Sequence, residues 1–492
     1  MAKTTKPVQT VNKQSYLVRI LAIILVVMLV GSGVLIYIVS ALAEDKAIDR
    51  YDVTIEVMEN EEALLITQRL SYTNRTGHAL DALCFSAAPN LFRSEQNIPY
   101  GTQTSQEAFS GGYTPFGIEI LDVRVNGSPA GWGMMNDEQT HMRLHTALEP
   151  GEEIGIEMKY ILLLCRNHGY LGISSDVWCL DGALIVPAVL DDAGEWIFSD
   201  VCVNTDWQFM NTSDIDITAV LPDGMQLCGP AAESTGENGA NIWHERIVGA
   251  NAFVLFLTDT QSERARTAKG TEIIVYSRRN AREIADAARG ILDVLENLLD
   301  TDARDIVVID TETAGRAPVY RGYIRLDYSK KDAQSDLVKA LCRERLGFGP
   351  FHMPVRDSWI PDILSEYTSF LYLEERSGYD EMIRALDREI LPAMGYTLPG
   401  NLFVTTSADA MSESEYDTIV LRRGCAAVHE LRLAMGRDAF IDMLRAAARC
   451  PVLDEDSFEA VLRMDGHEWD RFLADWIYNI GEYTDPGLET LG

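Results

Sequence analysis

The chain has 492 residues, of which 24% are charged and 47% hydrophobic, and its formal net charge is -33 at pH 7. A chain of this length and composition can form two or three globular domains, and it is not typical of a disordered protein. The negative charge argues against nucleic acid or an anionic membrane surface as a partner, because both are themselves negative.

The N-terminus combines a basic tail with a long uncharged stretch. Residues 1–19 hold four Lys or Arg residues and no acid, and residues 20–43 carry no charge. A helix of 24 residues is about 36 Å long, enough to cross a bilayer. We therefore expect a transmembrane helix at 20–43, with the tail at 1–19 in the cytoplasm and the bulk of the chain outside. A cleaved signal peptide ending at Ala41-Leu42-Ala43 is the alternative.

The next part of the chain, residues 44–262, has the pattern of an antiparallel β-domain. Four segments alternate apolar and polar residues between turn residues, at 51–57, 63–72, 154–160 and 214–222. This period of two predicts strands with one face buried, as in a β-sandwich. A stretch rich in Gln, Ser and Gly at 94–116 predicts a long surface loop.

Residues 263–480 form a second predicted domain, followed by a C-terminal tail at 481–492. A polar joint at 262–270 precedes short apolar strands at 272–276, 305–309 and 322–326, and a helical apolar period covers 284–298. From Ser335 onward the pattern is almost entirely helical. The predicted fold class is therefore multidomain α+β, with an antiparallel β-domain followed by a mixed sheet and helices.

Eight cysteines are scattered through the chain without CxxC spacing, which excludes a zinc ribbon. In an exported protein, Cys165 with Cys179 and Cys202 with Cys228 are close enough in sequence to be considered as disulfides. Buried free thiols are the alternative, because sequence does not fix the pairing.

Several segments, taken in order, carry a family resemblance. They are a strand-rich opening at 51–92, an L-x-P-G-E turn at 148–152, LeuSerGluTyr at 364–367, ArgArgGly at 422–424, and the helices at 335–347, 457–461 and 472–477. Over nearly all of residues 50–480 the sequence resembles the aminopeptidase N family of gluzincin zinc metallopeptidases. The resemblance implies a saddle-shaped β-domain followed by a thermolysin-like domain with a zinc site.

The resemblance fails at the residues that the zinc chemistry needs. Where the family has His-Glu-x-x-His, this chain has Lys339, Ala340 and Arg343 in the corresponding positions. Zinc requires two neutral imidazoles one turn apart and a third ligand, and a Glu beside the first His takes a proton from bound water. Glu366 corresponds to the third ligand by its flanking pattern, although Asp362 stands at the stricter spacing.

Other positions of the implied cleft also differ. Val319 stands where the family has the Glu that binds the substrate amine, while Gly322 is retained. Leu421 occupies the place of the transition-state tyrosine, and Tyr416 lies five residues earlier. We therefore interpret Lys339, Ala340, Arg343 and Glu366 as a degenerate metal site without catalytic residues.

Two positive side chains replace the implied metal ligands on one helix face. Lys339 and Arg343 are four residues apart and so lie on the same side of a helix. We predict that one of them forms a salt bridge with Glu366, because a buried carboxylate without a cation is costly. Solvated surface charges on amphipathic helices are the alternative interpretation.

A displaced metal site has little support in the sequence. His244-Glu245 and His429-Glu430 each form half of a zinc motif without a second His, and we interpret both histidines as structural. His352, in the segment before Glu366, could join carboxylates in a different zinc site.

The sequence therefore predicts a membrane-anchored, extracytoplasmic pseudopeptidase of gluzincin fold that binds no cofactor. Its partner would be a peptide or protein segment held in the retained cleft, and no nucleic acid is expected. An active zinc aminopeptidase with a displaced metal site is one alternative. An envelope assembly or sensing protein, in which the fold serves as a spacer or scaffold, is another.

Overall fold

A computed structural model describes residues 48–58, 61–191, 194–198, 204–205, 209–236, 240–347, 357–394, 402–450, 453–466 and 469–478. Residues Asp49–Gly492 form one unit by their contacts, separate from Met1–Ile48. The predicted transmembrane helix and the tails at 1–19 and 481–492 lie outside the described residues. Within the described ranges, no helix is both long and apolar enough to cross a membrane.

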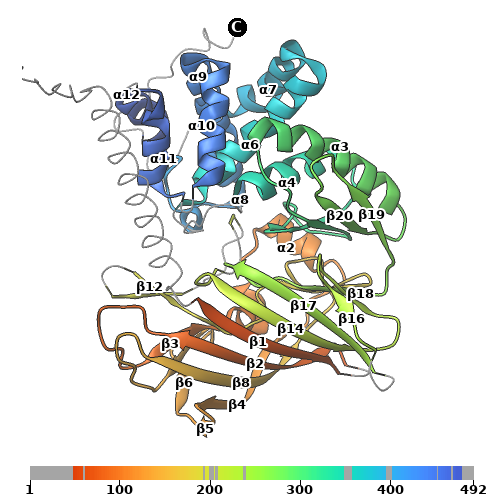
Figure 1. The fold of residues 1–492 in the computed structure, drawn as a ribbon, viewed down its shortest axis with the longest axis vertical. Coiled ribbons are helices and arrows are strands. Elements are labelled where there is room, and N and C mark those ends of the chain that lie inside the picture. Colours follow the sequence, from red (N-terminus) through yellow and green to blue (C-terminus); the bar gives the residue numbers. More distant parts are fainter. Residues whose placement is uncertain are drawn as a thin grey trace, which may run out of the picture. The chain divides into compact units, whose positions relative to one another are not determined.

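The first layer of the Asp49–Gly492 unit is a sheet of eight strands (Figure 1). Its spatial order is β16-β17-β14-β1-β2-β8-β4-β5. The strands are β1 (Asp49–Val57), β2 (Ala63–Thr73), β4 (Gly117–Val125), β5 (Ser128–Pro129), β8 (Glu153–Leu163), β14 (Ser213–Leu221), β16 (Glu233–Ser234) and β17 (Asn241–Ala250). Strands were predicted at all four alternating segments, and the structure confirms them. The pairing is mostly antiparallel, but β1 runs parallel to β14.

The inner face of this sheet packs on two sheets of four strands. Their orders are β15-β18-β10-β9 and β11-β3-β7-β6. The strands are β3 (Leu83–Ser86), β6 (Trp132–Met134), β7 (His141–Leu144), β9 (Leu171–Ser174), β10 (Val177–Leu180), β11 (Val186–Pro187), β15 (Gln226–Cys228) and β18 (Phe256–Thr258), with a separate pair β12 (Val189–Leu190) and β13 (Trp196–Ile197).

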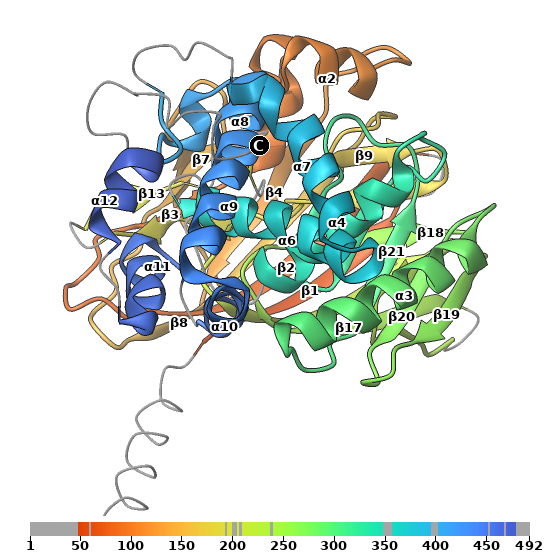
Figure 2. The same cartoon turned by 90° about the horizontal axis from the view of Figure 1, so that it is seen from above.

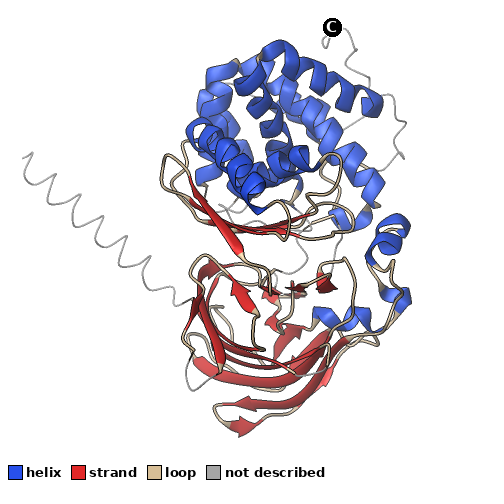
Figure 3. Cartoon of the chain, turned by 90° about the vertical axis from the view of Figure 1, so that its right-hand side faces the viewer, coloured by secondary structure: helices blue, strands red, loops and turns tan. Residues whose placement is uncertain are grey.

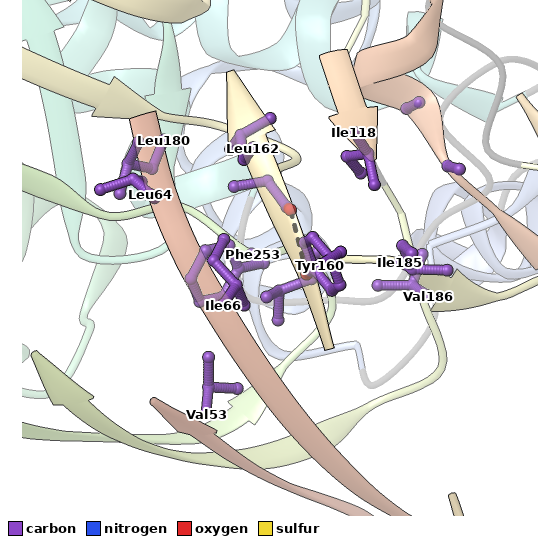
Figure 4. Close-up of a cluster of buried hydrophobic side chains, with 14 of the residues drawn as sticks. Val53, Leu64, Ile66, Ile118, Tyr160, Leu162, Leu180, Ile185, Val186 and Phe253 are labelled. Carbon is purple, nitrogen blue, oxygen red and sulfur yellow. Dashed lines mark hydrogen bonds between the residues drawn. The ribbon is translucent and has the colours of Figure 1, made fainter. Parts of the chain in front are cut away.

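Alternate residues of the long strands form the core between these sheets. Figure 4 shows Ile66, Tyr160, Ile185 and Phe253 as neighbours in this cluster, and all four are fully buried. The Tyr160 hydroxyl donates to Gln68 Oε1 at 2.8 Å, which satisfies a polar group that would otherwise be stranded in an apolar core.

The predicted surface loop at 94–116 is more structured than its composition suggests. It contains the short helices η2 (Glu95–Asn97) and α2 (Thr102–Ala108), and it follows η1 (Ala88–Arg93). Tyr100, Ala108 and Phe116 are buried, and Phe116 stacks on Phe92. These apolar anchors fold the Gln- and Ser-rich stretch against the β-domain.

The second part of the unit is built on a mixed sheet of five strands in the order β19-β20-β21-β23-β22. The strands are β19 (Ser262–Arg266), β20 (Glu272–Tyr276), β21 (Ile306–Asp310), β22 (Val319–Tyr320) and β23 (Tyr323–Leu326). The joint predicted at 262–270 therefore includes a strand, which the period-of-two pattern missed because its side chains are mostly polar and exposed.

Both faces of the central strands are covered, which explains their continuous apolar sequence. Ile273 and Val275 of β20 pack on one face with helix α3 (Ala281–Leu299) and helix α4 (Ala333–Gly347). Ile274 and Tyr276 of the same strand face Val177, Cys179 and Phe256 of the β-domain. Figure 3 shows this sheet between the helices and the larger sheet.

Helices make up the rest of the described chain. They are α6 (Trp359–Ser377), α7 (Tyr379–Met394), η4 (Ala408–Ala410), α8 (Glu413–Tyr416), the π-helical η5 (Asp417–Arg423), α9 (Gly424–Met435), α10 (Arg437–Arg449), α11 (Glu455–Leu462), η6 (Arg463–Asp465), α12 (Asp470–Phe472) and η7 (Leu473–Ile477). The multidomain α+β architecture is thus confirmed. The residue limits of the predicted domains stay a prediction.

Helix α6 lies at the centre of this helical layer, beside α4 and α9 (Figure 2). Gly424, at the start of α9, permits the close approach of α9 to α6. A Cβ at this position would lie 2.3 Å from Ile363 Cγ2, closer than two carbon atoms can pack. The glycine of the ArgArgGly segment is therefore explained by packing.

The structure tests one of the two possible disulfides, that between Cys165 and Cys179. Cys165 and Cys179 are both buried free thiols, so that predicted pair does not form. Cys228 is also free and buried, while Cys202 lies outside the described residues. Burial raises the pKa of each of these three thiols.

Candidate functional site

Two ion pairs join α4 to α6 at the centre of the candidate site. Lys339 Nζ contacts Glu366 Oε1, and Arg343 Nε lies 3.0 Å from Asp362 Oδ1. Each partner is four residues from the next on its own helix, and the pairs run in opposite order along the two helices. This is the register of antiparallel packing, with one turn of α4 facing one turn of α6.

The predicted salt bridge between Glu366 and one of the two cations is therefore confirmed, and the cation is Lys339. Glu366 is 8% exposed, so its carboxylate needs the ammonium group that faces it. The same ammonium lies 3.2 Å from Glu389 Oε2 on α7 and thus serves two carboxylates. Burial lowers the pKa of Lys339, but Glu366 and Glu389 outweigh that effect and hold the pKa above its ordinary value. The side chain keeps its proton.

Asp362 is the second buried acid, and it is held by three donors. Besides Arg343, the Arg316 guanidinium lies 3.1 Å from Asp362 Oδ2, and the Tyr416 hydroxyl donates to the same oxygen at 2.9 Å. Burial acts to raise the pKa of Asp362, but Arg316, Arg343 and the Tyr416 hydroxyl lower it below its usual range. Ser358 Oγ lies 3.2 Å from the Tyr416 hydroxyl. The carboxylate remains ionised.

A cavity of about 240 Å³ opens beside these ion pairs. It is lined by residues of the β-domain and of the helical layer: Thr104, Tyr170, Asn204, Gly315, Arg316, Asp336, Lys339, Glu366, Glu413, Tyr416, Asp417 and Leu421. Acids outnumber bases in this lining, so the cavity favours a ligand that carries positive charge.

The carboxylate of Asp336 is the acid most available to a ligand. Glu366 faces Lys339, Asp417 faces Arg422, and Glu413 accepts hydrogen bonds from the β-domain. Asp336 forms no ion pair within the described ranges and is partly exposed. Burial raises the pKa of Asp336, and Lys330 and Lys339 partly offset the shift.

The wall opposite α4 comes from a helix with an irregular turn. The Ser412 side chain caps α8, and the Ser412 backbone N–H donates to Glu415 Oε2 at 2.8 Å. Tyr416, the last residue of α8, contacts Asp362, and the π-helical turn that follows places Leu421 on the cavity. Such turns often occur where a helix serves a functional site. Leu421 has no group that could hydrogen-bond to a reacting oxygen.

Glu413 of α8 connects this wall of the cavity to the β-domain. Its carboxylate accepts from Thr104 Oγ1 at 2.6 Å and from Gly101 N at 3.1 Å. Asn204 adds two bonds from its amide nitrogen, to Ala408 O at 2.9 Å and Met411 O at 2.8 Å. The cavity is therefore a feature of both parts of the unit.

The remaining predicted positions lie elsewhere. Ala340 and Val319 are buried in the hydrophobic cluster between the five-stranded sheet and its helices. Gly322 has a left-handed φ of 78° and lines a different cavity. None of the three belongs to the lining of the cavity beside Lys339.

The two half motifs have structural roles. His429 is buried, and its Nδ1 lies 2.8 Å from the Tyr367 hydroxyl. Burial, with a contribution from Arg432, lowers the pKa of His429 to about 4, so the ring is neutral. His244 is exposed on β17, with Nδ1 3.2 Å from Thr218 Oγ1. His352 lies outside the described residues.

The side chains at this site do not fit zinc. Lys339 and Arg343 present an ammonium and a guanidinium to Glu366 and Asp362, and these groups offer protons where a metal needs lone pairs. Glu366, the remaining acid, is already occupied by Lys339. Across the described part of the chain, no group of three His, Cys, Asp or Glu side chains is arranged to hold a metal ion.

The fold is that of the two-domain M1 zinc metallopeptidases, as comparison with solved structures shows. The M1 zinc metallopeptidase from Deinococcus radiodurans superimposes with a TM-score of 0.64 at 13% identity, covering 87% of this chain and 93% of that one. A mutant of a two-domain M1 zinc metallopeptidase bound to L-arginine gives 0.63 at 13% identity over 87% and 93% of the two chains.

A mutant of the Deinococcus enzyme with a Tyr-Ser-Ala substrate gives a TM-score of 0.61 at 13% identity over the same shares of the chains. Neither a family model nor a curated protein sequence matches this chain. At this identity the likeness establishes the fold.

Sequence reasoning missed much of the polar setting of the site. It noted Asp362 by its spacing but assigned it no role, and it did not single out Arg316, Asp336, Glu389 or Glu413. The spacing of Asp362 and Glu366 matches that of Lys339 and Arg343, and this matched spacing was the available signal for the second ion pair.

Proposed function

We propose that this chain is a catalytically inactive relative of the zinc aminopeptidases that uses the retained cavity to bind a peptide or protein segment. This proposal rests on the contact of the Lys339 ammonium with Glu366. A protonated amine at that position supplies the positive charge that a metal ion would supply, without a vacant coordination position or an activated water.

The cavity is suited to a ligand with a positive group and several hydrogen-bonding groups. Asp336 offers a carboxylate, while Tyr170, Asn204 and Thr104 offer neutral polar side chains. The similar structures hold L-arginine and a Tyr-Ser-Ala substrate, which supports a peptide as the class of ligand. We assign the ammonium or guanidinium group of such a peptide to Asp336.

The test measures turnover, metal content and binding on the same preparation. We expect no hydrolysis of an aminopeptidase substrate panel and less than stoichiometric zinc. We also expect saturable binding of a tripeptide with a free N-terminus, and weaker binding of its N-acetylated form. Asp336→Asn should weaken binding about tenfold, because it removes a charge-assisted contact. Asp223→Asn, in an exposed turn of the β-domain, is the matched control and should leave binding unchanged.

Stoichiometric zinc with metal-dependent turnover would instead support the active metallopeptidase. A chain without turnover that also binds none of the peptides would contradict the binding role.

The location of this activity is a separate proposal. We propose that residues 20–43 anchor the chain in a membrane with its bulk on the extracytoplasmic side, which the uncharged stretch and the basic tail support. In intact cells, an added protease should digest residues after 44 and spare a tag placed before residue 1. Digestion of the tag alone would reverse the orientation, and recovery of the whole chain in the soluble fraction would contradict the anchor.

A further inference from the structure

A second cavity of about 330 Å³ lies apart from the first and shares no lining residue with it. It is formed by β17, by the segment that follows this strand, and by the turn between β22 and β23. Its volume falls at the lower end of the range of small-molecule sites.

Most of the lining is apolar. Ile247 and Val248 come from β17, Val254 comes from the segment after it, and Tyr320 and Tyr323 come from the five-stranded sheet. Val248 is 61% exposed, which is unusual for a large aliphatic side chain. An apolar molecule in this cavity would cover that surface.

Arg321 provides one charged contact at the rim. Its Nη1 donates to Gly249 O at 3.3 Å, and it forms no ion pair with any carboxylate of the described residues. Burial and the neighbouring guanidinium of Arg304 lower the pKa of Arg321, and Glu344 offsets part of this shift. Arg304 itself is paired with Glu344 at 3.0 Å. Arg246, also in the lining, lies 3.7 Å from Asp214 and from Asp216. Arg321 is therefore the arginine of this lining that has no ion pair within the described residues and can pair with a ligand carboxylate.

The inner wall contains a carboxyl group that is not fully ionised at neutral pH. Glu245 is 4% exposed on β17, and its Oε2 has no hydrogen-bond partner within the part of the chain that the structure describes. Burial raises the pKa of Glu245 to about 7, although backbone groups of Ala231 and Arg246 lower it in part. In its neutral form this carboxyl group does not repel an anionic ligand.

We propose that this cavity binds a small carboxylate with an apolar body. The carboxylate pairs with Arg321, and the body lies against Ile247, Val254 and Tyr323. The site goes beyond the proposed peptide-binding role, because it is lined by different residues and favours the opposite charge.

The first test measures binding of hexanoate to the full-length chain by isothermal titration calorimetry. The expected dissociation constant is on the order of 1 mM, with no saturable binding of hexylammonium or acetate. Arg321→Gln should weaken hexanoate binding about tenfold. Arg266→Gln, an exposed position on β19, should leave it unchanged. Equal binding of hexanoate and hexylammonium, or no effect of Arg321→Gln, would overturn the proposal.

The second test uses pH. Hexanoate should bind more weakly at pH 8 than at pH 6, because ionised Glu245 then repels the ligand in the same cavity. Glu245→Gln should remove this dependence.

The other charged or titratable groups near Glu245 are Arg246, Arg304, Asp305, Arg321, Tyr276, Tyr323 and Cys228. Burial raises the pKa of Tyr276, Tyr323 and Cys228 further above this range, so they stay protonated. A pH dependence that persists in Glu245→Gln would refute this part, and absence of hexanoate binding at both pH values would refute the site.

Discussion

Replacement of Lys339 by Met should destabilise the chain, because it removes the cation that faces two carboxylates. Glu366 is 8% exposed, and it loses its charge-assisted contact. Glu389 loses a contact of 3.2 Å. A buried pair that is broken costs about 3–5 kcal/mol, whereas an exposed pair costs less than about 1 kcal/mol. The Lys339 side chain is 32% exposed, so we expect a loss of about 2–3 kcal/mol.

The size of the loss should depend on pH. Without Lys339, an ionised Glu366 carboxylate is buried without its cation, and protonation of the carboxylate at low pH removes this cost. The stability of the variant should therefore be closer to that of the native chain at pH 5 than at pH 8. Urea unfolding followed by circular dichroism at the two pH values measures the difference.

A double-mutant cycle separates the ion pair from general effects of the substitution. Adding Glu366→Gln to Lys339→Met should recover about 1–2 kcal/mol, because the buried charge is then absent. Lys331→Met, on the exposed surface before α4, is the matched control and should change stability by less than about 0.5 kcal/mol. Additive single effects, or a Lys339→Met loss as small as the control's, would refute the reasoning.

Three further predictions concern stability. Gly424→Ala should lower the free energy of unfolding by about 1–3 kcal/mol, because its Cβ would lie 2.3 Å from Ile363 Cγ2. Gly290→Ala, on the open face of α3, should instead raise it by about 0.5–1 kcal/mol, with both measured by urea unfolding. Between pH 5 and pH 8 the free energy of unfolding of the native chain should fall by on the order of 2–3 kcal/mol relative to that of Glu245→Gln, because the folded pKa of Glu245, raised to about 7, disfavours its ionisation. Parallel pH profiles of thermal unfolding for the two proteins would contradict this. Glu344→Gln should cost about 3–5 kcal/mol in urea unfolding, since the fully buried carboxylate holds two arginines and the Gly322 amide; a loss below about 1 kcal/mol would show that the arginines find other partners.

The elements that the sequence predicted well are those with a regular apolar period. Strands β1, β2, β8 and β14 bury every second residue, and α3 buries one stripe, so local pattern and final burial coincide. Strand β19 was missed because an exposed edge strand has no buried face to reveal it. Phe116 and Tyr100 anchor a stretch whose composition indicates a loop, and only their packing shows this.

The candidate site was half predictable for the same reason. Lys339 and Arg343 share a helix face by spacing alone, which was enough to predict one salt bridge. The second pair required the antiparallel register of α4 and α6, and sequence does not give that register. Arg316 reaches Asp362 from the segment before β22, a tertiary contact without a local pattern.

The central claim is that the Lys339–Glu366 pair stands in the place of a metal centre, and zinc stoichiometry tests it directly. The native chain, purified and measured by plasma mass spectrometry, should hold well below one zinc per chain. The double substitution Lys339→His and Arg343→His, which places two imidazoles one turn apart opposite Glu366, should gain close to one zinc. One equivalent of zinc in the native chain, or none in the restored variant when it is folded, would contradict the account.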